Sequence, residues 1–134
     1  MSRLATVLAI LGGLFISYIG VNYLIDPQSI AAGFGLPLVP SDSAFLLVKG
    51  VRDLGSGLVI FTLLIAGQRR GLGFTMLAMA FIPLGDAVVV LSRHGVPALA
   101  YLMHGGTAVI VALTGALLLR ATRPQPAPTQ PRGA

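Results

Sequence analysis

The sequence predicts an all-α integral membrane protein, a four-helix bundle of four membrane spans. Only 10% of the 134 residues are charged, 55% are hydrophobic, and the mean hydropathy is +0.89. A soluble domain usually has about 25% charged residues, so this chain has too few polar side chains to cover a surface that faces water. Four apolar runs are each long enough to cross about 30 Å of hydrocarbon. We therefore expect a multi-pass protein of the cell membrane, with the lipid bilayer as its first partner.

Each apolar run ends at a proline or at charged residues. In chain order the four expected spans cover about residues 4–25, 44–67, 72–91 and 97–119. We expect helices because every run is longer than the strand of a membrane barrel and none alternates between apolar and polar residues. The first run is too long for the apolar part of a signal peptide and has no good cleavage site, so we interpret it as a retained span.

The arginines indicate the orientation of the spans. With four spans, Arg93 lies on one side and six arginines lie on the other. These six are Arg3, Arg69, Arg70, Arg120, Arg123 and Arg132. Because positive residues favour the cytoplasmic side, both termini are predicted to be cytoplasmic. The long connection over residues 26–43 then faces outward, where we expect a short helix on the outer surface or folded over the bundle.

The bundle is expected to occupy residues 1–120, and the last residues form a different kind of segment. Residues 121–134 contain four prolines and no long apolar run. Proline removes a backbone donor and prevents regular hydrogen-bonded structure. We therefore predict a disordered, proline-rich cytoplasmic tail.

The composition also excludes several functions. The chain has no cysteine, so disulfides and thiolate metal sites are impossible. No phosphate-binding glycine loop or metal-ligand spacing is present, and we expect no metal and no cofactor. The net charge of +5 arises mainly from arginines at span ends, where membrane topology requires them. We therefore expect no nucleic-acid partner.

The most informative segment lies inside the second expected span and reads Lys49-Gly50-Val51-Arg52-Asp53. One such charge at a bilayer centre costs roughly 2.5–3.5 kcal/mol on insertion scales, so three charges in five residues need partners and a purpose. Lys49, Arg52, Asp53 and Ser56 follow the i, i+3, i+4, i+7 pattern of one helix face. Lys49 and Asp53 are spaced to form an ion pair.

Polar residues of the other three spans fall at a similar depth. With the predicted orientation, the outer half of the bundle holds all of the strongly polar intramembrane side chains. Besides the second span, they are Tyr18 and Asn22 in the first span, Asp86 in the third, and Tyr101 and His104 in the fourth. Pro83 should kink the third span beside Asp86. We therefore predict a shared polar pocket in this half.

Three functions remain open for this pocket. In the first, it binds or converts a lipophilic small molecule by acid–base chemistry such as epoxide opening, isomerisation or cyclisation. Asp53 and Asp86 would then be the acid and base, with Arg52 separating their pKa values and His104 moving a proton. The ligand would be bound by Lys49, Asn22, Tyr18, Tyr101 and Ser56. In the second, the chain is a small transporter that forms a homo-oligomer. In the third, it is an accessory or structural subunit whose ion cluster only holds the helices together.

The Lys49–Asp53 segment with Gly57, the pair Gly85-Asp86 and the pair His104-Gly105 also carry a family resemblance. Together they resemble the domain of unknown function 4267 family, a group of small four-helix membrane proteins of bacteria and fungi. The similarity covers about residues 4–119. It implies four spans and no established activity, so it assigns no catalytic residue.

Overall fold

The computed structural model describes residues 2–122 of the chain, and this part is helical without any strand. The helices are α1 (Ser2–Ile25), α2 (Pro27–Ala32), α3 (Ala44–Ile65), α4 (Arg69–Met79), α5 (Phe81–Ser92), the π-helix η1 (Leu99–Gly105) and α6 (Gly106–Ala121). The predicted all-α class is therefore confirmed. Most of the predicted disordered tail lies outside the described residues, and that expectation stays a prediction.

Three helical stretches are long and apolar enough to cross a membrane. They are Arg3–Ile25, Arg69–Ser92 and Leu99–Ala121, which correspond to α1, to α4 with α5, and to η1 with α6. Three of the four predicted spans thus have the expected helical form. The fourth, α3, has 22 residues but carries Lys49, Arg52 and Asp53, and these charges set it apart from the other three.

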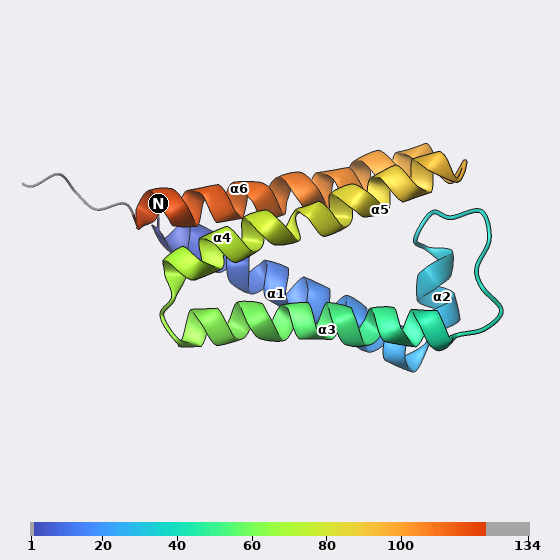
Figure 1. Ribbon diagram of the computed structural model, residues 1–134, viewed down its shortest axis with the longest axis horizontal. Coiled ribbons are helices and arrows are strands. Elements are labelled where there is room, and N and C mark those ends of the chain that lie inside the picture. Colours follow the sequence, from blue (N-terminus) through green and yellow to red (C-terminus); the bar gives the residue numbers. More distant parts are fainter. Residues whose placement is uncertain (1, 123–134) are drawn as a thin grey trace, which may run out of the picture.

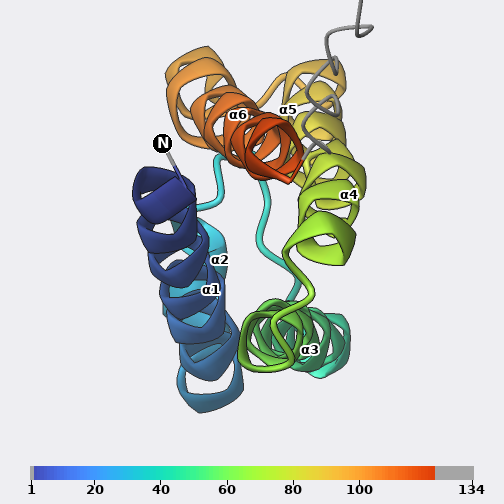
Figure 2. The same ribbon diagram turned by 90° about the vertical axis from the view of Figure 1, so that its left-hand side faces the viewer.

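The long helices are arranged as two pairs (Figures 1 and 2). The first pair is α1 with α3, and in the second pair α4 and α5 run alongside α6 and η1. The start of α1, the α3–α4 turn and the end of α6 lie at one end of the molecule (Figure 1). Starting from this end, α1 contacts α6 and then diverges from it, while α3 makes no backbone contact with α5 or α6. The two pairs are therefore splayed apart at the opposite end.

The α1–α3 pair is held so closely that side chains would not fit between the backbones. A Cβ atom on Gly20 would lie 2.6 Å from the backbone nitrogen of Leu54, and one on Gly50 would lie 2.9 Å from the Gly20 oxygen. Gly57 faces Ser17 and the Gly13 oxygen in the same way. Small residues allow this approach, which membrane helices use because lipid supplies little hydrophobic drive for association.

The third predicted span is divided into two helices. The break falls at Ala80, three residues before Pro83. Proline lacks the N–H that would bond to the carbonyl four residues earlier, and its ring crowds that carbonyl, which accounts for a break at this point. The expected distortion therefore takes the form of a short interruption between α4 and α5.

The connection between α1 and α3 passes over the splayed end. It begins with α2, whose N-terminus is capped by Asp26 through a 3.3 Å bond from the Ser29 amide. The Gln28 side chain then donates to the Pro40 oxygen at 2.9 Å, which holds the two ends of the connection together. At its far point, the Gly35 oxygen accepts a 2.8 Å bond from the Val96 amide, beyond the end of α5. The connection therefore bridges the two helix pairs.

Candidate functional site

The centre of the candidate site is the ion pair that the Lys49 and Asp53 spacing predicted. Lys49 Nζ donates to Asp53 Oδ2 at 2.6 Å. The Asp53 side chain is only 3% exposed, so its negative charge is held away from the surroundings. Arg52 Nε lies 3.8 Å from the other Asp53 oxygen, but its own side chain is 57% exposed. Asp53 thus has two cationic partners, of which Lys49 is the closer and the more enclosed.

Two aromatic rings surround the Lys49 ammonium group. It lies 5.0 Å from the centre of the Tyr23 ring and 5.4 Å from the centre of the Phe34 ring. A cation over an aromatic face is stabilised by the ring quadrupole, and the effect grows when water is excluded. Tyr23 is a buried residue near the end of α1, and Phe34 lies in the connection after α2. Lys49 is therefore fixed by α1, α3 and the connection together.

His104 approaches the same aromatic ring from the second helix pair. Its Nε2 lies 2.8 Å from the Phe34 carbonyl oxygen, and because a carbonyl only accepts, Nε2 carries the proton and donates it. The two rings are tilted by 52° with their centres 4.5 Å apart. His104 is buried within the π-helix η1, a rare kind of helix that frequently occurs at functional sites. Phe34 thus links Lys49 on one pair to His104 on the other.

Asp86 lies on α5, across from this group. Its carboxylate is within electrostatic range of Lys49, His104 and Arg52, and also of the like charge on Asp53. Within residues 2–122, however, its side chain forms no hydrogen bond and no ion pair. Asp86 therefore contributes charge to the site without being closed against a partner. We call Lys49, Asp53, Asp86, His104, Tyr23 and Phe34 together the Lys49 site.

The remaining predicted residues lie around this site with other contacts. Ser56 Oγ donates to the Arg52 carbonyl at 3.0 Å, and the Asn22 side chain donates to the Tyr18 carbonyl at 2.7 Å. Both bonds stay within one helix turn. Tyr18 and Tyr101 are 63% and 65% exposed, so neither ring is enclosed by the described residues. The structure thus brings together Lys49, Asp53 and His104, with Asp86 in electrostatic range.

Sequence reasoning missed Tyr23 and Phe34 as members of the site. The sequence favours its more polar neighbour Asn22, but it is the Tyr23 side chain that is buried against Lys49. Phe34 lies in a segment with no helical or strand period, so no pattern predicts its direction. One signal was available for Tyr23: it is a large amphipathic side chain at the outer end of a span, where a buried cation needs an aromatic partner.

The arrangement suits proton transfer and binding of a polar group better than metal chemistry. Within residues 2–122, no group of three or more metal-ligating side chains is gathered in one place. Asp53 is held by cations, whereas the Asp86 carboxylate can accept a proton or a hydrogen bond without first breaking an ion pair. Lys49 and Arg52 would attract an anionic or carbonyl oxygen. The Nε2 proton of His104 is occupied by the Phe34 carbonyl.

The helices and their exposed apolar side chains define an all-helical protein of the membrane class. The chain belongs to the family described as domain of unknown function DUF4267, whose model matches residues 13–118. The matched range includes every member of the Lys49 site, and the expected family resemblance is confirmed. No curated protein and no solved structure gives a significant match.

Proposed function

We propose that α3 is a fourth membrane span and that the chain forms a four-helix bundle with both termini in the cytoplasm. At about 1.5 Å per residue, the 22 residues of α3 extend over about 33 Å, enough to cross the hydrocarbon core. Its Lys49–Asp53 pair is directed toward Tyr23 and Phe34, while Val48, Val51 and Leu58 are exposed and suit contact with lipid. This placement reduces the cost of its charges.

The distribution of arginines supports this orientation. Arg3, Arg69, Arg70 and Arg120 belong to the end of the molecule with the α3–α4 turn, whereas Arg93 follows α5 at the other end. An excess of positive charge marks the cytoplasmic side. The Lys49 site would then lie in the outer half of the membrane, beneath the connection that contains α2.

We infer that the Lys49 site binds a lipophilic small molecule through an oxygen-bearing polar group. The observation that carries this proposal is the Asp86 carboxylate, which lies within electrostatic range of three cationic or protonatable side chains and, within residues 2–122, forms no hydrogen bond or ion pair with any of them. A cluster that served only to hold helices together would gain from closing this pair, because an unpaired charge away from water is costly. A ligand that accepts from Lys49 or Arg52 and donates to Asp86 would complete the site.

If the bound molecule is also converted, Asp86 is the best placed base. It would take a proton from the ligand while Lys49 and Arg52 stabilise negative charge that develops on the ligand oxygen. Asp53 would hold Lys49 in position and thus act as a positioning residue. Epoxide opening, isomerisation and cyclisation all need this combination of a base and an electrophilic partner.

The structural hypothesis has one observation in its favour, namely the 2.6 Å Lys49–Asp53 bond, which is complete without any ligand. The transporter hypothesis requires Asp86 to bind and release protons or substrate from both sides. Proton-coupled uptake into vesicles would distinguish transport from binding or catalysis.

The experiment compares the purified protein with Asp86→Asn and with a matched control, Asp42→Asn. The Asp42 side chain accepts from the Ala44 amide at the start of α3, and asparagine caps helices as well as aspartate does. We expect a lipophilic molecule to co-purify with the wild type and with the control, as detected by mass spectrometry of organic extracts, and to be lost from Asp86→Asn. Thermal unfolding in detergent should be similar for all three. Retention of the molecule by Asp86→Asn, or unfolding of that variant alone, would contradict the proposal.

A further inference from the structure

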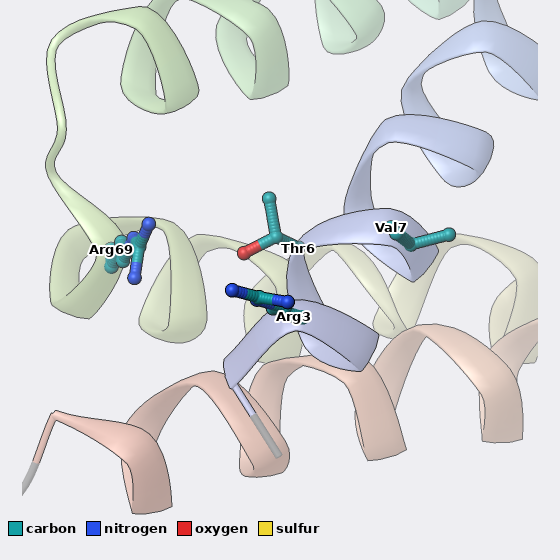
Figure 3. A pocket seen from close by; sticks show the side chains of 4 residues that line it. All are labelled: Arg3, Thr6, Val7 and Arg69. Carbon is teal, nitrogen blue, oxygen red and sulfur yellow. The ribbon is translucent and has the colours of Figure 1, made fainter.

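A second site lies at the opposite end of the molecule from the Lys49 site. A hollow of about 280 Å³ is lined by Arg3, Thr6 and Val7 at the start of α1 and by Arg69 at the start of α4 (Figure 3). In the close view, the Arg3 and Arg69 side chains flank the same space, and the Thr6 hydroxyl oxygen is directed toward it (Figure 3). Residues more than sixty positions apart in the sequence thus line one hollow.

Among the described residues, no acidic side chain balances the charge of this hollow. The four acidic residues of the chain are Asp26, Asp42, Asp53 and Asp86, and none of them lies among the residues that line it. Within the described part of the chain, neither Arg3 nor Arg69 forms an ion pair. Arg70 and Arg120 add two further positive charges at this end. An anion between the two guanidinium groups would relieve their repulsion.

A phosphate group fits this chemistry. The planar guanidinium fork donates two parallel hydrogen bonds to phosphate oxygens. Both α1 and α4 begin beside the hollow, so the positive ends of their dipoles add to the attraction. This effect supports the site, but the two arginines are its main determinant.

The surface next to the hollow indicates that the phosphate belongs to a lipid. From Val7, the exposed side chains of Leu11 and Leu14 continue along one face of α1, since their spacing is i, i+4, i+7. Each is more than half exposed. An acyl chain would lie along this apolar face while its headgroup occupied the hollow, whereas a free phosphate ion would gain nothing from it.

We propose that Arg3 and Arg69 form a binding site for the phosphate of an anionic phospholipid, whose acyl chain packs along Val7, Leu11 and Leu14. The site is separate from the Lys49 site and does not depend on the function proposed for it. It positions the start of α1 and the start of α4 against the same lipid molecule.

The test is native mass spectrometry of the full chain in detergent with phosphatidylglycerol or phosphatidylcholine of identical acyl chains. We expect one tightly retained phosphatidylglycerol, with phosphatidylcholine at least about tenfold weaker, because charge-assisted hydrogen bonds dominate the contact. The double variant Arg3→Gln/Arg69→Gln should lose this preference. Arg93→Gln, an exposed arginine at the other end, should keep it.

One further variant and one competition measurement complete the test. Val7→Glu places a carboxylate beside the arginines at an exposed position, so it should abolish lipid retention without altering thermal unfolding, even if the double variant folds poorly. Inorganic phosphate at millimolar concentration should not displace the lipid. Equal retention of both lipids, retention by Val7→Glu, or displacement by inorganic phosphate would each overturn the assignment of a lipid site.

Discussion

Two parts of the α3 surface differ in how they contact the rest of the molecule. The buried face with Gly50 and Gly57 is in direct backbone contact with α1, with no room for a Cβ atom. Lys49 lies at the edge of this glycine face, where its ammonium group is near the Tyr23 ring of α1 and the Phe34 ring of the connection, and α3 makes no contact with α5. The glycine face is therefore closed by the helices themselves, whereas its Lys49 edge is closed in part by an irregular segment.

This difference separates what holds the fold together from what is free to serve a function. Contacts between backbones cannot adapt, so the α1–α3 interface fixes the position of α3. The Lys49 edge also depends on Phe34 and on the irregular connection that carries it, which can rearrange at lower cost than a helix interface. A site that admits a ligand is more easily built at this edge than on the glycine face.

The largest effect on stability is expected at the glycine face of α3, where it packs against α1. Gly20→Leu would drive a side chain into the backbone of Leu54 and Gly50, where neither neighbour can move aside without separating α1 from α3. Overpacking typically costs about 1–3 kcal/mol and sometimes more, and a clash with two backbone segments belongs at the upper end of this range. We expect a protein that is unfolded or strongly destabilised in detergent, as measured by thermal unfolding followed by circular dichroism.

The matched control for this change is Gly55→Ala on α3. A Cβ atom at Gly55 has no neighbour within 4 Å. This variant should unfold at the wild-type temperature or slightly above it, because alanine favours the helix more than glycine does. Equal stability of Gly20→Leu and the control would show that the α1–α3 interface is not the fixed element of the fold.

The next effect concerns the Lys49–Asp53 ion pair at the edge of the glycine face. Lys49→Met leaves the buried Asp53 carboxylate with only Arg52 as a cation, which lies 3.8 Å away and is 57% exposed, so we expect a loss of about 2–3 kcal/mol in the free energy of unfolding. The double variant Lys49→Met/Asp53→Leu removes both charges and should recover most of this loss. Denaturant unfolding in detergent measures both values.

The outcome of the double variant also tests the structural hypothesis. A pair retained only for stability should leave the double variant as unstable as Lys49→Met. Recovery would mean that the fold does not require the charges and would support their retention for binding.

The sequence predicts the helices and the Lys49–Asp53 pair well, because both follow from local periodicity. Apolar length predicts the spans, and the i, i+4 spacing predicts the ion pair. The position of Phe34 beside Lys49 and His104 does not follow from local periodicity. It depends on two long-range hydrogen bonds of the connection, from the Gln28 side chain to the Pro40 oxygen and from the Val96 amide to the Gly35 oxygen. Such contacts join residues far apart in an irregular segment, where no period exists. The π-helix around His104 likewise has no signal in the sequence pattern that distinguishes it from an α-helix.

The smallest expected effect is at Phe34, the residue that joins the two helix pairs. Phe34→Ala removes the ring that contacts Lys49 and His104 but leaves the carbonyl that binds His104 Nε2. A buried Phe→Ala change costs about 3–5 kcal/mol, and because Phe34 is only half-buried we expect about 1–2 kcal/mol. The variant should fold, yet the His104 ring should become open to reagent on one side. Modification by diethylpyrocarbonate, measured by mass spectrometry, should therefore rise at His104 and stay constant at the exposed His94.

The matched control is Phe45→Ala, which removes an 81% exposed ring at the start of α3 and should change neither stability nor His104 reactivity. If His104 stays protected in Phe34→Ala, the connection is not what shields His104, and the helices themselves must shield the Lys49 site.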